Sequence, residues 1–366
     1  MTEVKEKVPQ SKARSRKDGA AIPLDEQDKK LMNVMQSEFP LIAEPYPLIA
    51  ERAGLEVDDA MARAQRLLDH RIIREITPIF DTRALGYESM LVAAKVDTQY
   101  PHRPAEIINS HPGVSHNYLR THEFNLWFTI ATPPDSELGL QGTLDVLQRM
   151  TGAESIRQLP TLTMFKINMN LEMEGDTDAL AAKVEAVPPR ELERQPYDER
   201  DIAVIRALQG PMAVVDRPYD EAAAEVGITT EELLAHLEAM IPRHLLRRVA
   251  AILFHRRAGF SANGMGVWKV KPSDVPEIGG RMAAVRGISH CYERPTYEDW
   301  PYSVFTMAHG RSKEECDAVL QSIADEHDLH GEDRAVLYSS TEYKKIRLHY
   351  FTDDYREWEE EHGSPA

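Results

Sequence analysis

The chain has 366 residues, of which 42% are hydrophobic, 28% charged and 7% aromatic, values typical of a water-soluble protein with about two domains. Its apolar runs are far shorter than the roughly 20 residues of a membrane helix, and two cysteines are too few for a disulfide framework or a cysteine-built metal site. No signal peptide is visible, and we expect a reduced cytoplasmic setting. The net charge of −17 disfavours nucleic acid as a partner.

Residues 1–20 are basic and polar with almost no apolar side chain, so we predict that this tail is disordered. After the tail, the sequence repeats itself at an offset of about 173 residues. Asp25-Glu26-Gln27-Asp28 returns as Asp198-Glu199-Arg200-Asp201, and Gly113-Val114-Ser115-His116 returns as Gly287-Ile288-Ser289-His290. We therefore predict a tandem duplication with a charged, proline-containing linker over residues 172–196.

Each half opens with three short helices. Apolar residues at helical spacing predict them over residues 25–36, 48–53 and 58–68 in the first half, and over 202–208, 222–226 and 230–237 in the second. Gly54 and Gly227 stop the second helix of each set. Three short helices with a glycine turn before the third are typical of a helix-turn-helix. We predict such heads over residues 21–71 and 197–247.

A sheet domain is expected after each head. Apolar runs on both sides of Gly86 and of Gly259 predict one β-hairpin in each half. The pattern then predicts a helix, two strands, a second helix and a last strand, the last strands lying near 161–169 and 344–351. This order indicates an α+β fold, a ferredoxin-like βαββαβ sandwich with helices on one face of an antiparallel sheet. We place the sandwiches at residues 72–171 and 248–366.

A helix-turn-helix head followed by such a sandwich resembles the Lrp/AsnC family of regulators, whose head binds DNA and whose sandwich dimerises and senses amino acids. The heads of this chain are acidic, because residues 24–71 and 197–248 each hold ten acidic and six basic residues. A helix that reads DNA needs basic residues to meet the phosphates, but residues 229–240 contain three glutamates and no lysine or arginine. We therefore expect the heads to be scaffolding and expect no nucleic acid as a partner.

Histidine, tyrosine and arginine are concentrated at one place in each sandwich. The two runs are Ser115-His116-Asn117-Tyr118-Leu119-Arg120 and Ser289-His290-Cys291-Tyr292-Glu293-Arg294. They resemble the signature of the siroheme decarboxylases, Lrp/AsnC-like proteins of tetrapyrrole biosynthesis that usually act as pairs of related subunits. Residues 253–269 resemble the second-subunit type, so the pair looks fused here. The resemblance implies removal of two acetate carboxyl groups from siroheme, giving 12,18-didecarboxysiroheme for heme d1 or for heme.

This reaction gives the repeated residues their expected roles. Loss of an acetate carboxyl group needs an electron sink, which the macrocycle supplies, and a proton donor near neutral pH, which histidine supplies. Strand alternation places the histidine, tyrosine and arginine of each run on one face. Thr296 takes the place of His122 in the second half, so we expect the halves to be catalytically unequal. The predicted catalytic residues are His116, His290, Tyr118, Tyr292 and His122.

Siroheme is a flat apolar ring rich in carboxylates, so its site needs cations and aromatic walls. A packing role is the alternative for the tyrosines, a solvated turn is the alternative for the arginines beside Gly259, and His309 is a weaker ligand candidate. No metal site and no organic cofactor are expected, and iron enters only as part of siroheme. The predicted substrate-binding residues are Arg120, Arg294, Arg256, Arg257, Lys269, Trp127, Trp268 and Phe260.

Two other functions are open at this point, a heme-responsive transcriptional regulator and a tetrapyrrole carrier without turnover. The expected partners are siroheme and its product, with no membrane. We expect the halves to form an intramolecular pseudo-heterodimer, and further association into a homo-oligomer is open. The sequence leaves undecided which half holds the active centre and whether a histidine ligates the iron.

Overall fold

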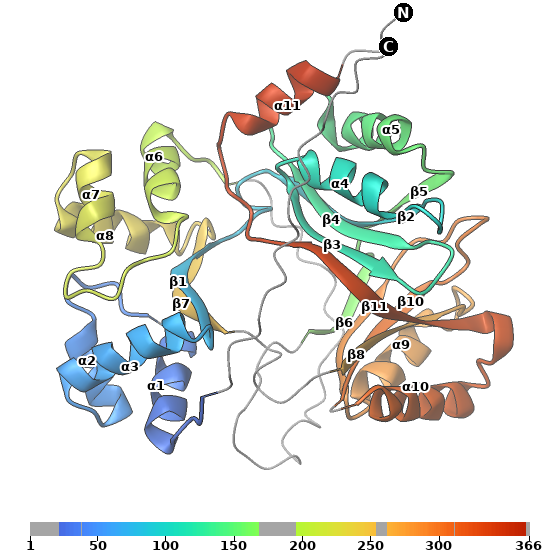
Figure 1. The fold of residues 1–366 in the computed structure, drawn as a ribbon, viewed down its shortest axis with the longest axis horizontal. Coiled ribbons are helices and arrows are strands. Elements are labelled where there is room, and N and C mark those ends of the chain that lie inside the picture. Colours follow the sequence, from blue (N-terminus) through green and yellow to red (C-terminus); the bar gives the residue numbers. More distant parts are fainter. Residues whose placement is uncertain (1–21, 38, 168–194, 254–261, 311, 364–366) are drawn as a thin grey trace, which may run out of the picture.

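A computed structural model describes residues 22–37, 39–167, 195–253, 262–310 and 312–363 (Figure 1). The predicted tail and nearly all of the predicted linker lie outside these residues. The helices of both heads lie on one side of the molecule in Figure 1, and most strands lie on the other. In the described part, no helix is long and apolar enough to cross a membrane. The domain boundaries drawn from the sequence stay a prediction.

Both halves carry the predicted helix-turn-helix head. The second helix of each head ends at a glycine in the left-handed region, Gly54 at φ +69° and Gly227 at φ +76°, where any other side chain would strain the backbone. In the second head, Asp198 and Thr229 begin their helices with capping boxes. The head helices are α1 (Glu26–Ser37), α2 (Tyr46–Ala53), α3 (Val57–Asp69), α6 (Glu199–Leu208), α7 (Asp220–Val226) and α8 (Thr230–Met240).

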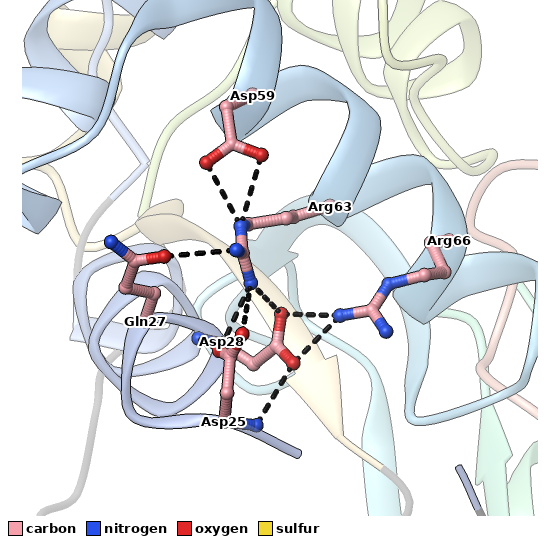
Figure 2. Close-up of polar contacts among 6 residues, drawn as sticks. All are labelled: Asp25, Gln27, Asp28, Asp59, Arg63 and Arg66. Carbon is pink, nitrogen blue, oxygen red and sulfur yellow. Dashed lines mark hydrogen bonds and ion pairs between the residues drawn. The ribbon is translucent and has the colours of Figure 1, made fainter. Parts of the chain in front are cut away.

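A buried carboxylate joins the first and third helices of the first head (Figure 2). Asp28 on α1 is 1% exposed and accepts hydrogen bonds from Arg66 Nη2 at 2.5 and 2.6 Å and from Arg63 Nη1 at 2.9 Å. Arg63 also contacts Asp25 at 2.8 Å and Asp59 at 3.0 Å. Both arginines of α3 are therefore paired with acids of their own head.

The second head repeats this arrangement with different cations. Asp201, the repeat partner of Asp28, lies 2.9 Å from His236 Nε2 and accepts from Arg243 Nη2 at 2.6 Å. Burial opposes ionisation of Asp201, but hydrogen bonds from Arg243 and from the Asp198 amide outweigh burial and lower its pKa. In each head, a buried acid on the first helix therefore binds cationic or imidazole side chains from the third helix, and in the second head also one that follows this helix.

The predicted hairpin around Gly86 is wrong. Strand β1 (Ile73–Phe80) pairs antiparallel with β7 (Leu246–Leu253) of the other half and not with the strand that follows it. The chain turns away after β1 because Asp81 Oδ1 accepts two backbone amides of the next turn, each at 3.0 Å. Gly259 lies outside the described residues, but the pairing of β7 with β1 overturns the second hairpin too. Alternation identifies a buried face and does not identify the partner strand.

The ribbon of β1 and β7 joins the two heads into one body. The amide of Phe39 in the first head donates to the Val249 carbonyl on β7 at 2.8 Å, and the amide of Met212 in the second head donates to the Ile76 carbonyl on β1 at 2.8 Å. Each head therefore packs on the strand of the opposite half. One apolar core runs through both heads and the ribbon.

The other described strands form one nine-stranded sheet in the order β5-β2-β4-β3-β11-β8-β10-β9-β6, with every neighbouring pair antiparallel. Helices α4 and α5 cover one outer face of this sheet in the first half, and α9 and α10 do so in the second (Figure 1), which confirms the predicted α+β arrangement. The first half contributes β2 (Glu88–Lys95), α4 (His102–Ser110), β3 (Val114–Arg120), β4 (Leu126–Thr132), α5 (Gly139–Thr151), β5 (Ser155–Leu159) and β6 (Thr163–Ile167). The second half contributes β8 (Ala262–Trp268), α9 (Val275–Ala284), β9 (Ile288–Glu293), β10 (Val304–Gly310), α10 (Lys313–His327), the 3₁₀ helix η3 (Gly331–Asp333) and β11 (Arg334–Lys345).

The halves exchange their last strands. Residues 334–338 of β11 pair with β8 in their own half, and residues 339–345 pair with β3 in the first half. In the first half, β5 pairs with its own β2, whereas β6 pairs with β9 of the second half. Only residues 160–162 separate the edge strands β5 and β6, so these edges are at most about 15 Å apart along the chain. The sheet therefore curls into a nearly closed barrel, the name used below for β2–β6 with β8–β11.

The last segment of the chain differs from the prediction. Strand β11 ends at Lys345, and no strand runs to residue 351. Leu348, Tyr350 and Phe351 instead pack in the core of the heads. Helix α11 (Asp354–His362) follows and returns to the first half, where its Trp358 packs in the core under α4 and α5. Periodicity alone does not separate a strand from another segment that carries apolar side chains.

The buried acids predict a measurable loss of stability. Asp28→Asn should lower the free energy of unfolding by about 2 kcal/mol, because it removes a buried charge that two guanidinium groups hold. Asp201→Asn should behave alike, whereas Glu26→Gln, which breaks an exposed ion pair with Lys29, should cost less than about 0.5 kcal/mol. Urea denaturation followed by circular dichroism measures all three. Equal stability of the Asp28 and Glu26 variants would contradict the structural role.

Candidate active site

The middle of the barrel is a packed aromatic core drawn from both halves. Trp127 is 1% exposed, its ring lies 5.3 Å from Trp300 and 6.4 Å from Phe305 between centroids, and its indole N–H donates to the Phe124 carbonyl at 2.8 Å. Met265 and Val267 of β8 join the same cluster. Because this interior is filled by side chains, reacting groups that meet a ligand have to lie toward an end of the barrel.

His116 and His290 lie toward the same end of the barrel. Strands β3 and β9 are separated by an even number of steps in a sheet whose neighbours are all antiparallel, so they run in the same direction. Each histidine is near the start of its strand. Lys345, opposite His116, is the last residue of β11, after which the chain enters the core of the heads. The histidines therefore occupy the end of the barrel that faces the heads.

His116 is half-buried beside two hydroxyl groups. Its Nδ1 lies 3.0 Å from Ser115 Oγ and 3.3 Å from Thr129 Oγ1, and these two oxygens are 2.7 Å apart. Lys345 lies directly across on β11 and hence on the same face. Burial, together with the positive charges of Lys345 and Arg74, lowers the pKa of His116 to about 4. The imidazole is therefore neutral at neutral pH.

His290 has an equivalent hydroxyl partner and different neighbours. Its Nδ1 lies 2.7 Å from Ser289 Oγ. Met307 lies directly across on β10, and His309 follows two residues later on the same face of that strand. Burial, together with the charges of His309 and Lys166, lowers the pKa of His290 to about 4. Both repeats thus present a neutral histidine held by the preceding serine.

Each histidine is followed along its strand by a tyrosine. The rings of His116 and Tyr118 are 6.2 Å apart between centroids, and those of His290 and Tyr292 are 6.0 Å apart. Burial raises the pKa of Tyr292, so its hydroxyl keeps its proton at neutral pH. Histidine and tyrosine therefore form a continuous polar strip on the inner face of each strand.

The arginines that complete the two runs lie deeper in the barrel. Arg120 Nη1 donates to the Leu337 carbonyl at 3.1 Å, and Arg294 Nη1 donates to the Leu159 carbonyl. The Leu337 carbonyl stands where β11 passes from one half to the other, and the Leu159 carbonyl stands at the end of β5, just before the chain crosses to β6. Burial lowers the pKa of both guanidinium groups to about 10, and within the described residues the Nε atom of each is buried without a hydrogen-bond partner. These arginines fix the strand exchange as well as carrying charge.

Several predicted site residues lie away from the histidines. His122 is in the turn after β3, where its ring lies 5.3 Å from Trp300. Trp268 is buried on the helix-covered side of the sheet and donates to Thr306 Oγ1 at 2.9 Å. Lys269 is exposed and lies 3.8 Å from an acid, Asp333. The predicted residues that lie outside the described part of the chain are Arg256, Arg257 and Phe260.

The structure adds three cations that the sequence did not single out, one of them Lys166 beside His290, and it strengthens the case for His309. Arg74 on β1 and Lys345 on β11 act on His116, and His309 acts on His290. Cross-strand register explains why Lys345 was missed, since its partner strand belongs to the other half. The repeat could have drawn attention to Arg83, whose charge lowers the pKa of Arg294, because it matches the predicted arginines beside Gly259.

In the described part of the chain, no three His, Cys, Asp or Glu side chains gather closely enough to hold a metal ion. The absence of a resident metal or cofactor stays a prediction, because the residues around Gly259 are outside the description.

Comparison with known proteins identifies both kinds of domain twice. A model described as a siroheme decarboxylase NirDL-like helix-turn-helix domain matches residues 28–74 and 201–247. A model described as an AsnC-like ligand binding domain matches residues 84–166 and 257–344. The predicted duplication of head and sandwich is therefore confirmed.

Relatives match nearly the full chain. A siroheme decarboxylase of Hydrogenobacter thermophilus is 38% identical over 333 residues, 90% of this chain and 96% of that protein. A siroheme decarboxylase alpha subunit of Oleidesulfovibrio alaskensis is 40% identical over 157 residues, 43% of this chain and 93% of that subunit. A crystal structure of the siroheme decarboxylase NirDL in complex with an iron-uroporphyrin III analogue matches with a TM-score of 0.72 and 32% identity, covering 92% of this chain and 98% of that chain.

The buried imidazoles predict an acid-shifted titration. In the ligand-free chain, His116 and His290 should remain neutral down to about pH 5 and titrate near the pKa of about 4 that burial imposes, well below the ordinary value near 6.5. NMR of histidine-labelled protein measures both, with His116→Gln and His290→Gln identifying the signals. Because the folded pKa is depressed, the two groups destabilise the fold only as the pH falls below 6.5. A titration at or above pH 6.5 would contradict the burial argument.

Proposed function

The chain belongs to the siroheme decarboxylase family, and we propose that it removes the carboxyl groups of two acetate side chains of siroheme without oxidation. The product is 12,18-didecarboxysiroheme, a precursor of heme d1 or of heme, and the enzyme is a carbon–carbon lyase. The observation that carries the proposal is the pair of serine–histidine units, one from each repeat, at the same end of one barrel. Binding of an iron-uroporphyrin analogue by NirDL supports a carboxylate-rich macrocycle as the ligand of this fold.

The main chemical contribution that the reaction requires from the protein is a set of proton donors. For each acetate side chain, the carbon–carbon bond to the carboxylate breaks, CO2 leaves, and the bonding electrons pass into the protonated macrocycle. The exocyclic carbon then gains a proton and becomes a methyl group, and the macrocycle releases the proton that it had taken up, so each decarboxylation consumes one proton in total. We assign this proton donation to His116 and His290, with Tyr118 and Tyr292 as the adjacent hydroxyl groups.

The depressed pKa values fit donors that become charged only when substrate is bound. Without ligand, burial keeps both imidazoles neutral. A substrate carboxylate placed beside an imidazole favours its protonated form and raises its pKa toward neutrality. Binding therefore creates the imidazolium that the reaction needs, next to a carboxylate already removed from water. The hydroxyl groups of Ser115 and Ser289 hold Nδ1 of each ring and leave Nε2 as the nitrogen that faces the substrate.

The exchanged strands support a single fused pseudo-heterodimer as the working unit. A separate alpha subunit corresponds to less than half of this chain, as a protein made of two fused subunits requires. Strand β11 gives His116 its neighbour Lys345, and β6 lies beside His290, so each histidine is flanked by a strand of the opposite half. Neither repeat builds its centre alone.

The structure of the heads opposes the regulator alternative. The arginines of α3 are bound by Asp25, Asp28 and Asp59 of the same head (Figure 2), which leaves them unsuited to phosphate groups. Helix α8, the equivalent helix of the second head, begins with the acids Glu231 and Glu232. Both heads contribute instead to the core that packs against the ribbon of β1 and β7.

The decarboxylation itself is the first test. Anaerobic incubation of the protein with siroheme should give a product lighter by two CO2 molecules, measured by mass spectrometry. His116→Ala and His290→Ala should each slow its formation about a hundredfold or more, because general acid catalysis contributes on that order. His330→Ala, an exposed histidine far from the barrel end, is the matched control and should keep the rate. Siroheme that stays bound with unchanged mass would instead indicate a carrier.

The heads predict an absence of DNA binding. The full chain should cause no mobility shift of its own promoter fragment at physiological salt, because its heads repel phosphates. Adding siroheme should not change this result. A salt-sensitive shift that Arg63→Gln abolishes would restore the regulator hypothesis.

A further inference from the structure

A β-bulge places Ser115 beside His116. On β3, Val114 pairs with Ile130 of β4 and His116 pairs with Thr129, so two residues of β3 stand opposite one residue of β4. Such a bulge bends its strand and re-aims the side chains. Consecutive side chains, which alternation would place on opposite faces, can therefore meet, and Ser115 Oγ lies 3.0 Å from His116 Nδ1.

Thr129 completes a triangle of polar atoms at this bulge. Its Oγ1 lies 2.7 Å from Ser115 Oγ and 3.3 Å from His116 Nδ1. The two hydroxyl protons satisfy the triangle when Thr129 donates to Ser115 and Ser115 donates to Nδ1. The neutral ring of His116 then carries its own proton on Nε2, the nitrogen that faces the substrate.

The second half has the same bulge with a different third partner. Ile288 pairs with Ala308 and His290 pairs with Met307, so Ser289 and His290 stand opposite Met307. Ser289 Oγ lies 2.7 Å from His290 Nδ1 and donates to the Met307 carbonyl at 3.3 Å. A carbonyl only accepts, so this bond uses the serine proton and Nδ1 donates to Oγ. His290 therefore carries its proton on Nδ1 and presents a bare Nε2.

Resting on the proposed function, we propose that Ser115 and Thr129 form a proton relay to Nδ1 of His116. Ser115 passes its proton to Nδ1, Thr129 passes its proton to Ser115, and a proton from solvent replaces the one that Thr129 gave. The ring then holds a proton on each nitrogen. As CO2 leaves and its bonding electrons pass into the macrocycle, the exocyclic carbon takes the Nε2 proton. After product release, Nε2 takes a proton from solvent and the Nδ1 proton returns along the chain.

The relay gives protons a way to His116 behind the bound ligand. A macrocycle that contacts Nε2 leaves Nδ1 as the other nitrogen through which the ring can become charged. Ser115 is buried and Thr129 is half-buried, so Thr129 is the member of the chain nearer to solvent. Thr129 acts through Ser115 and is a positioning residue.

The hydroxyl proton of Ser289 ends at a main-chain carbonyl, which cannot pass it on. His290 therefore takes its proton directly at the bare Nε2, on the ligand side. Both histidines remain proton donors, and they become charged through different nitrogens.

The ligand-free protein tests the resting arrangement. Both rings are neutral at neutral pH, and two-bond proton–nitrogen correlation NMR of histidine-labelled protein shows which nitrogen carries the proton. His116 should be protonated on Nε2 and His290 on Nδ1, with His116→Gln and His290→Gln identifying the signals. The same tautomer in both rings would overturn the relay.

The loss of one hydroxyl group tests the transfer itself. Thr129→Val keeps the shape of the side chain and should slow single-turnover release of CO2 from bound siroheme about tenfold, because Ser115 can no longer be resupplied. The affinity for siroheme, followed by the absorbance of the bound macrocycle, should stay within about twofold of wild type. Thr129→Ser should restore the rate.

A matched change elsewhere separates the relay from a general loss of packing. Thr151 on α5 bonds the Leu147 carbonyl through its hydroxyl, and Thr151→Val should keep both rate and affinity. A Thr129→Val protein with the wild-type rate, or one whose lost rate Thr129→Ser does not restore, would overturn the relay. A wild type that binds siroheme and releases no CO2 would overturn the proposed function instead, and the tautomers of the ligand-free protein would still decide whether the hydroxyl network is as described.

Discussion

The pairing of each half's last strand with the sheet of the other half is the constraint on which the rest of the molecule depends. Without it, β3 and β9 would be open edges, and the inner faces that carry Trp127 and Phe305 would be exposed to water. The exchange closes these faces on each other. It also brings both histidine centres to one end of one barrel, and it places Arg120 and Arg294 at the two points where the chain crosses from one half of the sheet to the other.

Charge is distributed according to this architecture. In the heads, buried acids meet cations and the groups cancel, so the third helices pack and present little positive charge. At the barrel end, the histidines are surrounded by hydroxyl groups, uncharged residues and a few cations, and burial keeps them neutral. An acidic protein can thus offer a local site to an anionic macrocycle, because the acids that set its net charge lie elsewhere.

The local elements of the fold could be predicted from the sequence, and their long-range partners could not. The glycines at the ends of α2 and α7, the helical spacing of the heads and the alternation of β3 and β9 are read within a few residues. The partner of β1 is β7, which lies in the other half, and no local pattern in Ile73–Phe80 distinguishes it from an adjacent strand. The same holds for the single strand that spans both halves, predicted too late in the chain by about ten residues.

In the candidate site too, the residues that form a local sequence motif could be predicted, and the residues that long-range strand pairing brings near them could not. His116 and His290 stood out because the repeat presents each with its serine, tyrosine and arginine, and the roles given to them stay predictions. Lys345 and Arg74 did not stand out, because their closeness to His116 arises from strands that the sequence assigns to another partner or another half. The alternation of side chains along a strand did not show which face of the sheet Trp268 occupies. Its aromatic ring faces the helices and not the interior of the barrel.

The strand exchange has a different meaning in one chain than in a dimer of identical subunits. In an identical pair, every substitution appears twice, once on each side of the two-fold axis, so neither centre can change alone. Here each position is encoded once, and the long strand carries Lys345 on one side while its counterpart carries Ile167 on the other. Fusion also keeps the two halves at a fixed and high effective concentration, so mismatched pairs cannot form by subunit exchange. Gene fusion thus frees a symmetric scaffold to evolve asymmetric chemistry.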